Sequence, residues 1–181
     1  MKRALAIAAA AIVAIAAALW FAPPLSPDTR IENKIIIARS PQQVFDYVTT
    51  SANWPRWHPS SLAVRGATDH PLAVGESVVE DFIVAGNRGT VTWTVTAREA
   101  PVRWSIEGRN VGSRGGGTVT YTLAPEGGGT RFTRVLTYHM PNLLAAILDD
   151  FGVRERVAAE SAEAVARLRT ALESGPTGPR P

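Results

Sequence analysis

An uninterrupted apolar segment runs from Ala4 to Ala22, close to the start of the chain. At 1.5 Å per residue, its roughly 19 residues approach the ~30 Å hydrocarbon thickness of a bilayer. Trp20 suits the membrane interface, and Pro23 and Pro24 break the helix directly afterwards. The segment therefore predicts a transmembrane helix over residues 1–22, and it leaves about 150 residues for one globular domain.

A cleavable signal peptide is the alternative interpretation of this segment. Lys2 and Arg3 form a charged amino-terminal region, and the alanines at 16–18 offer a cleavage site. The apolar run is longer than the usual signal core, which favours a membrane anchor. The positive charges before the span favour a single-pass orientation with the domain on the periplasmic or extracytoplasmic side.

The charge balance of the domain does not indicate a nucleic-acid partner. The chain has 19 Lys and Arg against 16 Asp and Glu, and removing Lys2 and Arg3 leaves 17 against 16, a net charge of +1. A nucleic-acid-binding domain needs a concentrated basic face. The absence of cysteine excludes disulfides, thiolate metal sites and cysteine nucleophiles.

The amino-terminal part of the domain predicts a strand followed at once by a short helix. Residues 23–30 contain three prolines and predict an extended linker. Residues 31–39 are rich in isoleucine and predict a strand. Ser40, Pro41 and Gln43 then have the types and spacing of an N-cap, a first-turn proline and a capping-box residue.

The remainder predicts a meander and a long helix. Residues 62–140 alternate in short runs between turn residues, which indicates about six antiparallel strands. Residues 142–173 carry apolar side chains at helical spacing, with Gly152 expected to kink or split the helix. Residues 174–181 are predicted to be disordered. An apolar sheet face and an amphipathic helix bury each other, so the sequence predicts an α+β domain over residues 31–173.

Several motifs occur along these elements: Ser40-Pro41 with Val44 and Phe45, the Trp54 and Trp57 pair, Gly75, and Gly129-Thr130. With these motifs, the order of the elements resembles the START-like helix-grip superfamily, also called SRPBCC, and within it the polyketide cyclase/dehydrase-like subgroup. The resemblance implies a curved antiparallel sheet packed on a long C-terminal helix, with a cavity between them that holds a lipid or another hydrophobic small molecule. It supplies no universal set of catalytic residues.

The candidate pocket consists of side chains that alternation or helical spacing places toward the sheet–helix space, and of an aromatic loop after the first helix. These candidates are Trp54, Trp57, His58, Glu80, Trp93, Trp104, Tyr121, Phe132, Arg134, Tyr138, Leu144, Leu148 and Phe151. A purely structural role in the core is the competing interpretation for each of them, and it is favoured for Trp54 and Trp57.

Arg134 and Glu80 are the ionisable candidates with the clearest pattern. Alternation puts Arg134 on the face of Phe132, and Glu80 on the face of Phe82. A buried guanidinium needs a carboxylate partner, and Glu80 is the nearest by pattern. The favoured alternative places both residues near strand ends or edges, where their charges reach water.

The remaining motifs argue against several classes of site but do not identify a reaction. The three histidines lack metal-site spacing, so the sequence predicts neither a metal nor a cofactor. The glycine clusters at 115–117 and 127–129 fit hairpin turns, and G-x-S-x-G and H-E-x-x-H do not occur. The oligomeric state is left open.

Three functions follow. The leading hypothesis is a membrane-tethered protein that binds a hydrophobic small molecule or lipid and is not a classical enzyme. The enzymatic alternative is a cyclase or dehydratase in which Glu80, His58 or Tyr138 moves protons. The third is a protein-interaction or envelope stress module whose pocket is filled by its own side chains.

Overall fold

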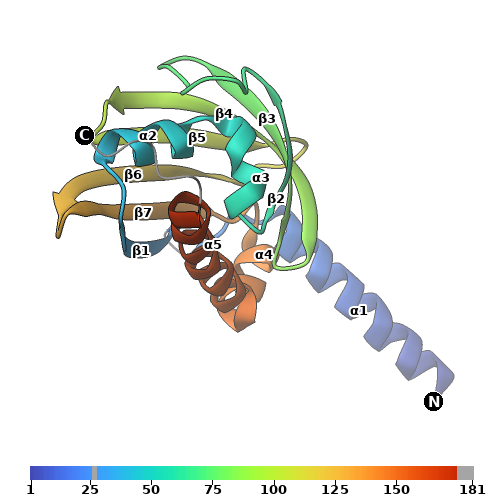
Figure 1. Cartoon of the computed structure of the whole chain (residues 1–181). Coiled ribbons are helices and arrows are strands. Elements are labelled where there is room, and N and C mark those ends of the chain that lie inside the picture. Colours follow the sequence, from blue (N-terminus) through green and yellow to red (C-terminus); the bar gives the residue numbers. More distant parts are fainter. Residues whose placement is uncertain (26–27, 175–181) are drawn as a thin grey trace.

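The computed structural model describes residues 1–25 and 28–174, and it has the predicted order of strand, helix, six strands and C-terminal helix (Figure 1). The elements are α1 (Lys2–Phe21), β1 (Thr29–Ile37), α2 (Pro41–Thr49), the 3-10 turn η1 (Ser51–Asn53), α3 (Trp54–Trp57), β2 (Ser61–Gly66), β3 (Ser77–Val84), β4 (Asn87–Glu99), β5 (Arg103–Asn110), β6 (Gly116–Glu126), β7 (Gly129–His139), α4 (Leu143–Leu148), η2 (Asp149–Val153) and α5 (Arg154–Ser174). The disorder predicted for 174–181 falls outside the described residues, except that Ser174 ends α5.

The seven strands form one antiparallel sheet in the order β1-β7-β6-β5-β4-β3-β2. The sheet curves around α5, and α2 and α3 lie against one part of it (Figure 1). On β6, Val119, Tyr121 and Leu123 are buried on the concave face. The threonines between them face outward, as the alternation predicts. The predicted α+β helix-grip fold is therefore confirmed.

The start of α2 has the local structure that its sequence predicts. The Ser40 hydroxyl accepts a hydrogen bond from the Gln43 amide at 3.3 Å, and the Gln43 side chain accepts one from the Ser40 amide at 3.1 Å. This capping box starts a helix whose Val44, Phe45 and Val48 are completely buried. α2 thus fills the concave face at one end of the sheet.

The predicted C-terminal helix is interrupted at Gly152, as the sequence suggests. Phe151 and Gly152 have non-helical dihedral angles, and Gly152 has a φ of +122°, which glycine adopts more readily than other residues. The interruption lies within η2 and separates α4 from α5. As a result, Leu148 is 54% and Phe151 84% exposed.

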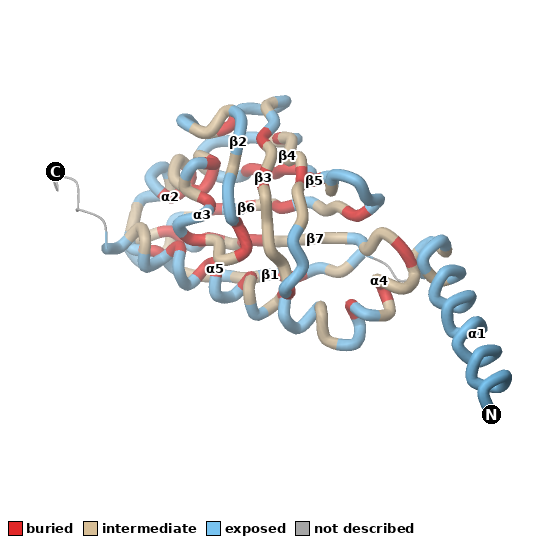
Figure 2. Tube along the Cα trace, turned by 90° about the vertical axis from the view of Figure 1, so that its right-hand side faces the viewer, coloured by how far each residue is buried: buried red, intermediate tan, exposed pale blue. Residues whose placement is uncertain are grey.

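The apolar helix α1 projects away from the domain, and none of its residues is buried (Figures 1 and 2). It is long and apolar enough to cross a membrane by length and composition. Its last turn lies next to α4, where the Leu143 amide donates a hydrogen bond to the Ala22 carbonyl at 3.0 Å. The start of α4 is thus fixed to the end of the apolar helix.

Candidate functional site

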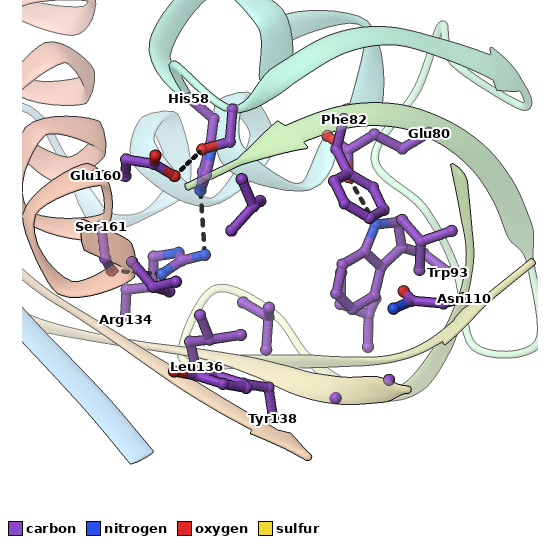
Figure 3. Close-up of a pocket in the computed structure, with 18 of the residues that line it drawn as sticks. His58, Glu80, Phe82, Trp93, Asn110, Arg134, Leu136, Tyr138, Glu160 and Ser161 are labelled. Carbon is purple, nitrogen blue, oxygen red and sulfur yellow. Dashed lines mark hydrogen bonds between the residues drawn. The ribbon is translucent and has the colours of Figure 1, made fainter. Parts of the chain in front are cut away.

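A cavity of about 300 Å³ lies between the concave face of the sheet and the first turns of α5 (Figure 3). Its walls are predominantly apolar side chains from β3 to β7, among them Phe82, Val91, Val119 and Leu136. The volume lies at the small end of the range typical of ligand pockets. The structure thus has the sheet–helix chamber that the helix-grip fold makes possible.

The two ends of the cavity differ in exposure. At one end the lining residues Trp57, Tyr121 and Arg134 are buried, and we call this end the floor. At the other end Asn87 and His139 are exposed, and we call this end the mouth. β7 runs from the floor toward the mouth and leads through Met140 and Pro141, which also line the cavity, into α4.

The structure brings most of the sequence candidates to this cavity. The candidates that line it are Trp54, Trp57, His58, Glu80, Trp93, Tyr121, Arg134 and Tyr138. Trp54 and Trp57 also pack in the core, with Trp54 edge-on to Trp104 at 6.4 Å between ring centroids and Trp57 edge-on to Tyr121 at 6.3 Å. Their structural role and their place in the cavity wall therefore coexist.

Five candidates lie elsewhere. Trp104 and Phe132 are fully buried in the core behind Tyr121, with ring centroids 5.4 and 5.1 Å from it. Leu144, Leu148 and Phe151 are absent from the lining, because the interruption at Gly152 takes their segment out of the line of α5. The expectation that these three helix residues reach the pocket is corrected accordingly.

The inner face of α5 supplies two polar residues that the sequence reasoning did not select as site residues. Glu160 accepts hydrogen bonds from the Ser60 hydroxyl at 2.8 Å and from the Ala85 amide at 2.9 Å. Ser161 is buried and donates to the Asn33 side chain. In the sequence, the feature that could have indicated a polar site on this helix is Ser161, a polar residue within an apolar helical stripe.

Arg134 is 4% exposed on β7, which is paired on both sides, so the favoured expectation that its charge reaches water is wrong. Its guanidinium donates to the Ser161 hydroxyl at 2.7 Å and to His58 Nε2 at 3.1 Å. Its Nε has no hydrogen-bond partner in the described part of the chain. Within residues 1–25 and 28–174, no carboxylate oxygen lies within 4.0 Å of this guanidinium. The direct Arg134–Glu80 pair is therefore also absent.

Glu80 is buried on β3, so the expectation of an exposed carboxylate is wrong here too. Its carboxylate accepts a hydrogen bond from Trp93 Nε1 at 2.7 Å (Figure 3). Burial raises the pKa of Glu80, although the hydrogen bond from Trp93 and the charge of Arg134 act in the opposite direction. Glu80 and Arg134 thus interact through space without a contact.

Three other titratable groups that line the cavity, His58, Tyr121 and Tyr138, have pKa values shifted toward the neutral form. Burial, and then the charge of Arg134, hold the pKa of His58 well below its ordinary value, so the ring accepts from Arg134 rather than carrying a charge. Burial raises the pKa of Tyr121 to about 12. Burial and hydrogen bonding to Asp149 raise the pKa of Tyr138, whose hydroxyl donates to Asp149 at 2.8 Å.

The polar groups that line the cavity do not form a metal centre. In the part of the chain that the structure describes, no cluster of three or more His, Asp or Glu side chains could hold an ion. Hydrogen-bond donors and acceptors near the floor, with apolar walls around them, are instead suited to orienting an organic ligand.

The sequence matches the family described as polyketide cyclase / dehydrase and lipid transport over residues 28–173. Among solved structures, the fold is similar to the protein TTHA0849 from Thermus thermophilus, with 12% identity, a TM-score of 0.67, and 82% of this chain and 100% of that chain covered. It is also similar to a protein from Rhodobacter sphaeroides, with 22% identity, a TM-score of 0.60, and coverage of 81% and 93%.

A third similar structure is DynU16, from the dynemicin biosynthetic locus. It has 19% identity and a TM-score of 0.59, and the match covers 82% of this chain and 49% of that chain. At such identities the likeness concerns the fold alone. No curated protein matches the chain.

Proposed function

The chain belongs to the polyketide cyclase/dehydrase and lipid transport family, and from this premise we propose that its cavity binds a hydrophobic small molecule or lipid beside a membrane. The observation that carries the proposal is the chamber of about 300 Å³ with predominantly apolar walls. Apolar walls with a few polar groups are the usual composition of a small-molecule site. The alternative of a pocket filled by its own side chains is not favoured by a chamber of this size.

The position of α1 supports the membrane part of the proposal. The end of this apolar helix is hydrogen-bonded to α4, which follows the mouth residues Met140 and Pro141. Leu148 at the end of α4 and Phe151 in η2 are exposed and add apolar surface to this segment. Exposed apolar side chains beside a membrane anchor suit contact with the bilayer interface. A hydrophobic ligand would then enter from the membrane without crossing water.

Native mass spectrometry of the full chain, released from detergent after purification from its host, tests ligand binding. We expect a reproducible hydrophobic adduct on the wild type and its loss in Val119→Trp, because Val119 lies in the cavity wall and a larger ring fills the chamber. Val111→Trp, on an exposed turn, is the matched control and should keep the adduct. A wild type without adduct, or an equal adduct on Val119→Trp, contradicts the proposal.

Intact-mass analysis tests the tether separately. A mature chain that retains residues 1–22 supports the anchor, whereas a chain that begins at Leu19 shows removal of a signal peptide. Because the chain contains no cysteine, Ser113→Cys on an exposed turn provides a single thiol. In intact cells, labelling of this thiol by a membrane-impermeant reagent is expected for a domain on the extracytoplasmic side, and protection contradicts that orientation.

A second function for the same cavity is acid–base catalysis by Glu80. A carboxyl whose pKa is raised by burial is suited to proton transfer near neutral pH. The other two candidates for proton transfer, His58 and Tyr138, already form hydrogen bonds within the protein. His58 accepts one from Arg134, and Tyr138 donates one to Asp149. Conversion of the co-purified ligand by the wild type and its loss in Glu80→Gln would favour the enzyme, whereas an unchanged ligand would favour carriage.

A further inference from the structure

Arg134 is a buried cation that no carboxylate contacts within residues 1–25 and 28–174. Its two hydrogen-bond acceptors are the Ser161 hydroxyl and the neutral His58 ring, neither of which carries a negative charge. Its third nitrogen, Nε, is buried and has no hydrogen-bond partner among the residues that the structure describes. A buried guanidinium normally has a carboxylate or phosphate against it, because neutral dipoles alone compensate poorly for lost hydration.

The acidic side chains of the cavity do not supply that anion. Glu80 accepts from Trp93 Nε1, and Glu160 accepts from Ser60 and the Ala85 amide. Among the residues described, neither carboxylate comes within 4.0 Å of Arg134. The hydroxyl of Tyr121, the remaining titratable group facing Arg134, has its pKa raised to about 12 and is neutral.

The position of Arg134 in the cavity indicates which end of a bound ligand would carry the negative charge. The residue lies at the floor, between Tyr121 on β6 and Asn33 on β1, while the apolar walls extend from there toward the mouth. Figure 3 shows the guanidinium beside His58 and Ser161, with Leu136 and Tyr138 following along β7. A ligand that enters through the mouth therefore reaches the cation with its leading end.

We propose that the ligand is an amphiphile with one anionic head group, a carboxylate, which binds Arg134 at the floor while its apolar body lies along the cavity toward the mouth. This inference rests on the proposed ligand-binding function and specifies its chemical class. A single negative charge matches the single guanidinium, and a carboxylate accepts two hydrogen bonds from it. A dianionic head would place its second charge near Glu80 and Glu160 without another cation to balance it.

Competition between two probes in native mass spectrometry tests the proposal on the full chain in detergent. Dodecanoic acid and dodecan-1-ol share a chain length and differ in the charge of the head group. We expect the wild type to prefer the acid about 10- to 100-fold, and Arg134→Gln to lose most of that preference while still binding the alcohol. Any difference in detergent partitioning between the probes is the same for every variant, so the change between variants is the result.

Arg131→Gln is the matched control, because Arg131 lies on the exposed face of the same strand and pairs with Glu126. It should keep the wild-type preference for the acid. Equal binding of both probes to the wild type, or an acid preference that persists in Arg134→Gln, overturns the inference alone. Binding of neither probe overturns the proposed function and the inference together.

A second measurement keeps the test decisive if Arg134→Gln does not fold. The carbonyl carbon-13 signal of labelled dodecanoic acid, bound to the wild-type protein at about pH 6, should be that of the ionised carboxylate. A neighbouring guanidinium favours the ionised form, whereas a carboxyl buried without a cation has a raised pKa and is protonated. Arg134→Lys, which keeps the charge, should give the same signal. A protonated carboxyl in the wild type overturns the inference.

Discussion

The concave face of the sheet is filled with side chains at one end and hollow at the other, although the same strands build both ends. At the filled end, Phe45, Trp104 and Phe132 are completely buried and pack with α2, α3 and the second half of α5. At the hollow end, Val91 and Val119 face the cavity opposite Val157 on the first half of α5. The strands alternate in the same way at both ends, so alternation alone does not decide where a cavity forms.

Two features produce the difference. The short helices α2 and α3 bring large side chains, including Trp54 and Trp57, over only one end of the sheet. At the other end, Gly117 on β6 lines the cavity and contributes no side chain to it. A Cβ at Gly117 would lie 2.4 Å from the Thr137 carbonyl oxygen, so this position excludes every larger residue without movement of the backbone. The hollow end is thus covered by the first half of α5 but not by α2 or α3, and Gly117 adds no side chain to its wall.

Two tryptophans that face the same side of the sheet provide the strongest test of this comparison. Trp104→Ala at the filled end should lower the free energy of unfolding by about 3–5 kcal/mol, because it leaves a closed void in the core. Trp93→Ala at the hollow end should cost about 1–3 kcal/mol, chiefly through the lost hydrogen bond to Glu80, because the ring already borders a cavity. Denaturant titration of both variants measures the difference, and equal losses would contradict the distinction between the ends.

Gly108→Ala should have an intermediate effect. The added Cβ would lie 2.4 Å from the Trp93 ring, so the indole must move toward the cavity, at about 1–3 kcal/mol. The variant should also lose affinity for the hydrophobic adduct, as measured by native mass spectrometry. Trp93→Leu in the same chain removes the ring and should recover most of the lost stability. A Gly108→Ala protein with wild-type stability and adduct would show that the ring moves without resistance.

The fold was largely predictable because its signals are local. The capping box at Ser40 and the alternation in β6 are patterns of neighbouring residues, and the structure has both. The break at Gly152 was also visible in the sequence, but its consequence was not. In the sequence, the helical spacing of apolar residues continues through Leu148 and Phe151. In the structure, the helix is interrupted at Phe151 and Gly152, and the side chains of Leu148 and Phe151 are exposed.

The site was less predictable because it depends on pairing and on which elements cover the sheet. Alternation gives the face of Arg134, but only the structure shows that β7 pairs with both β1 and β6, so that Arg134 lies away from the sheet edge and is buried. Trp93 and Trp104 lie on neighbouring strands, and alternation places both on the concave face. Trp93 lines the cavity whereas Trp104 lies in the core, because the helices that cover them come from elsewhere in the chain.

The smallest predicted effect concerns pH and the two faces of β3. The pKa of Glu80 is raised above its ordinary value of 4.5 by burial. Below about pH 4.5 the carboxyl is protonated in both the folded and the unfolded chain; as the pH rises, the unfolded chain ionises first, and stability falls until the folded pKa is passed. Glu80→Gln lacks this loss, so its Tm relative to the wild type should increase between about pH 4 and pH 7.

Asp81→Asn, one residue further along and on the opposite face, should show the reverse slope. Hydrogen bonds from Arg65 and Thr90 lower the pKa of Asp81 below its ordinary value of 3.8. Its contribution is therefore present above pH 3.8 and is lost as the pH falls through the folded pKa. The variant should be less stable than the wild type at neutral pH, and the deficit should shrink toward about pH 3, by a small amount because the pair is solvent-screened. Parallel slopes in the two variants would mean that Glu80 and Asp81 experience the same environment, and that the hollow end is open to water rather than an apolar chamber.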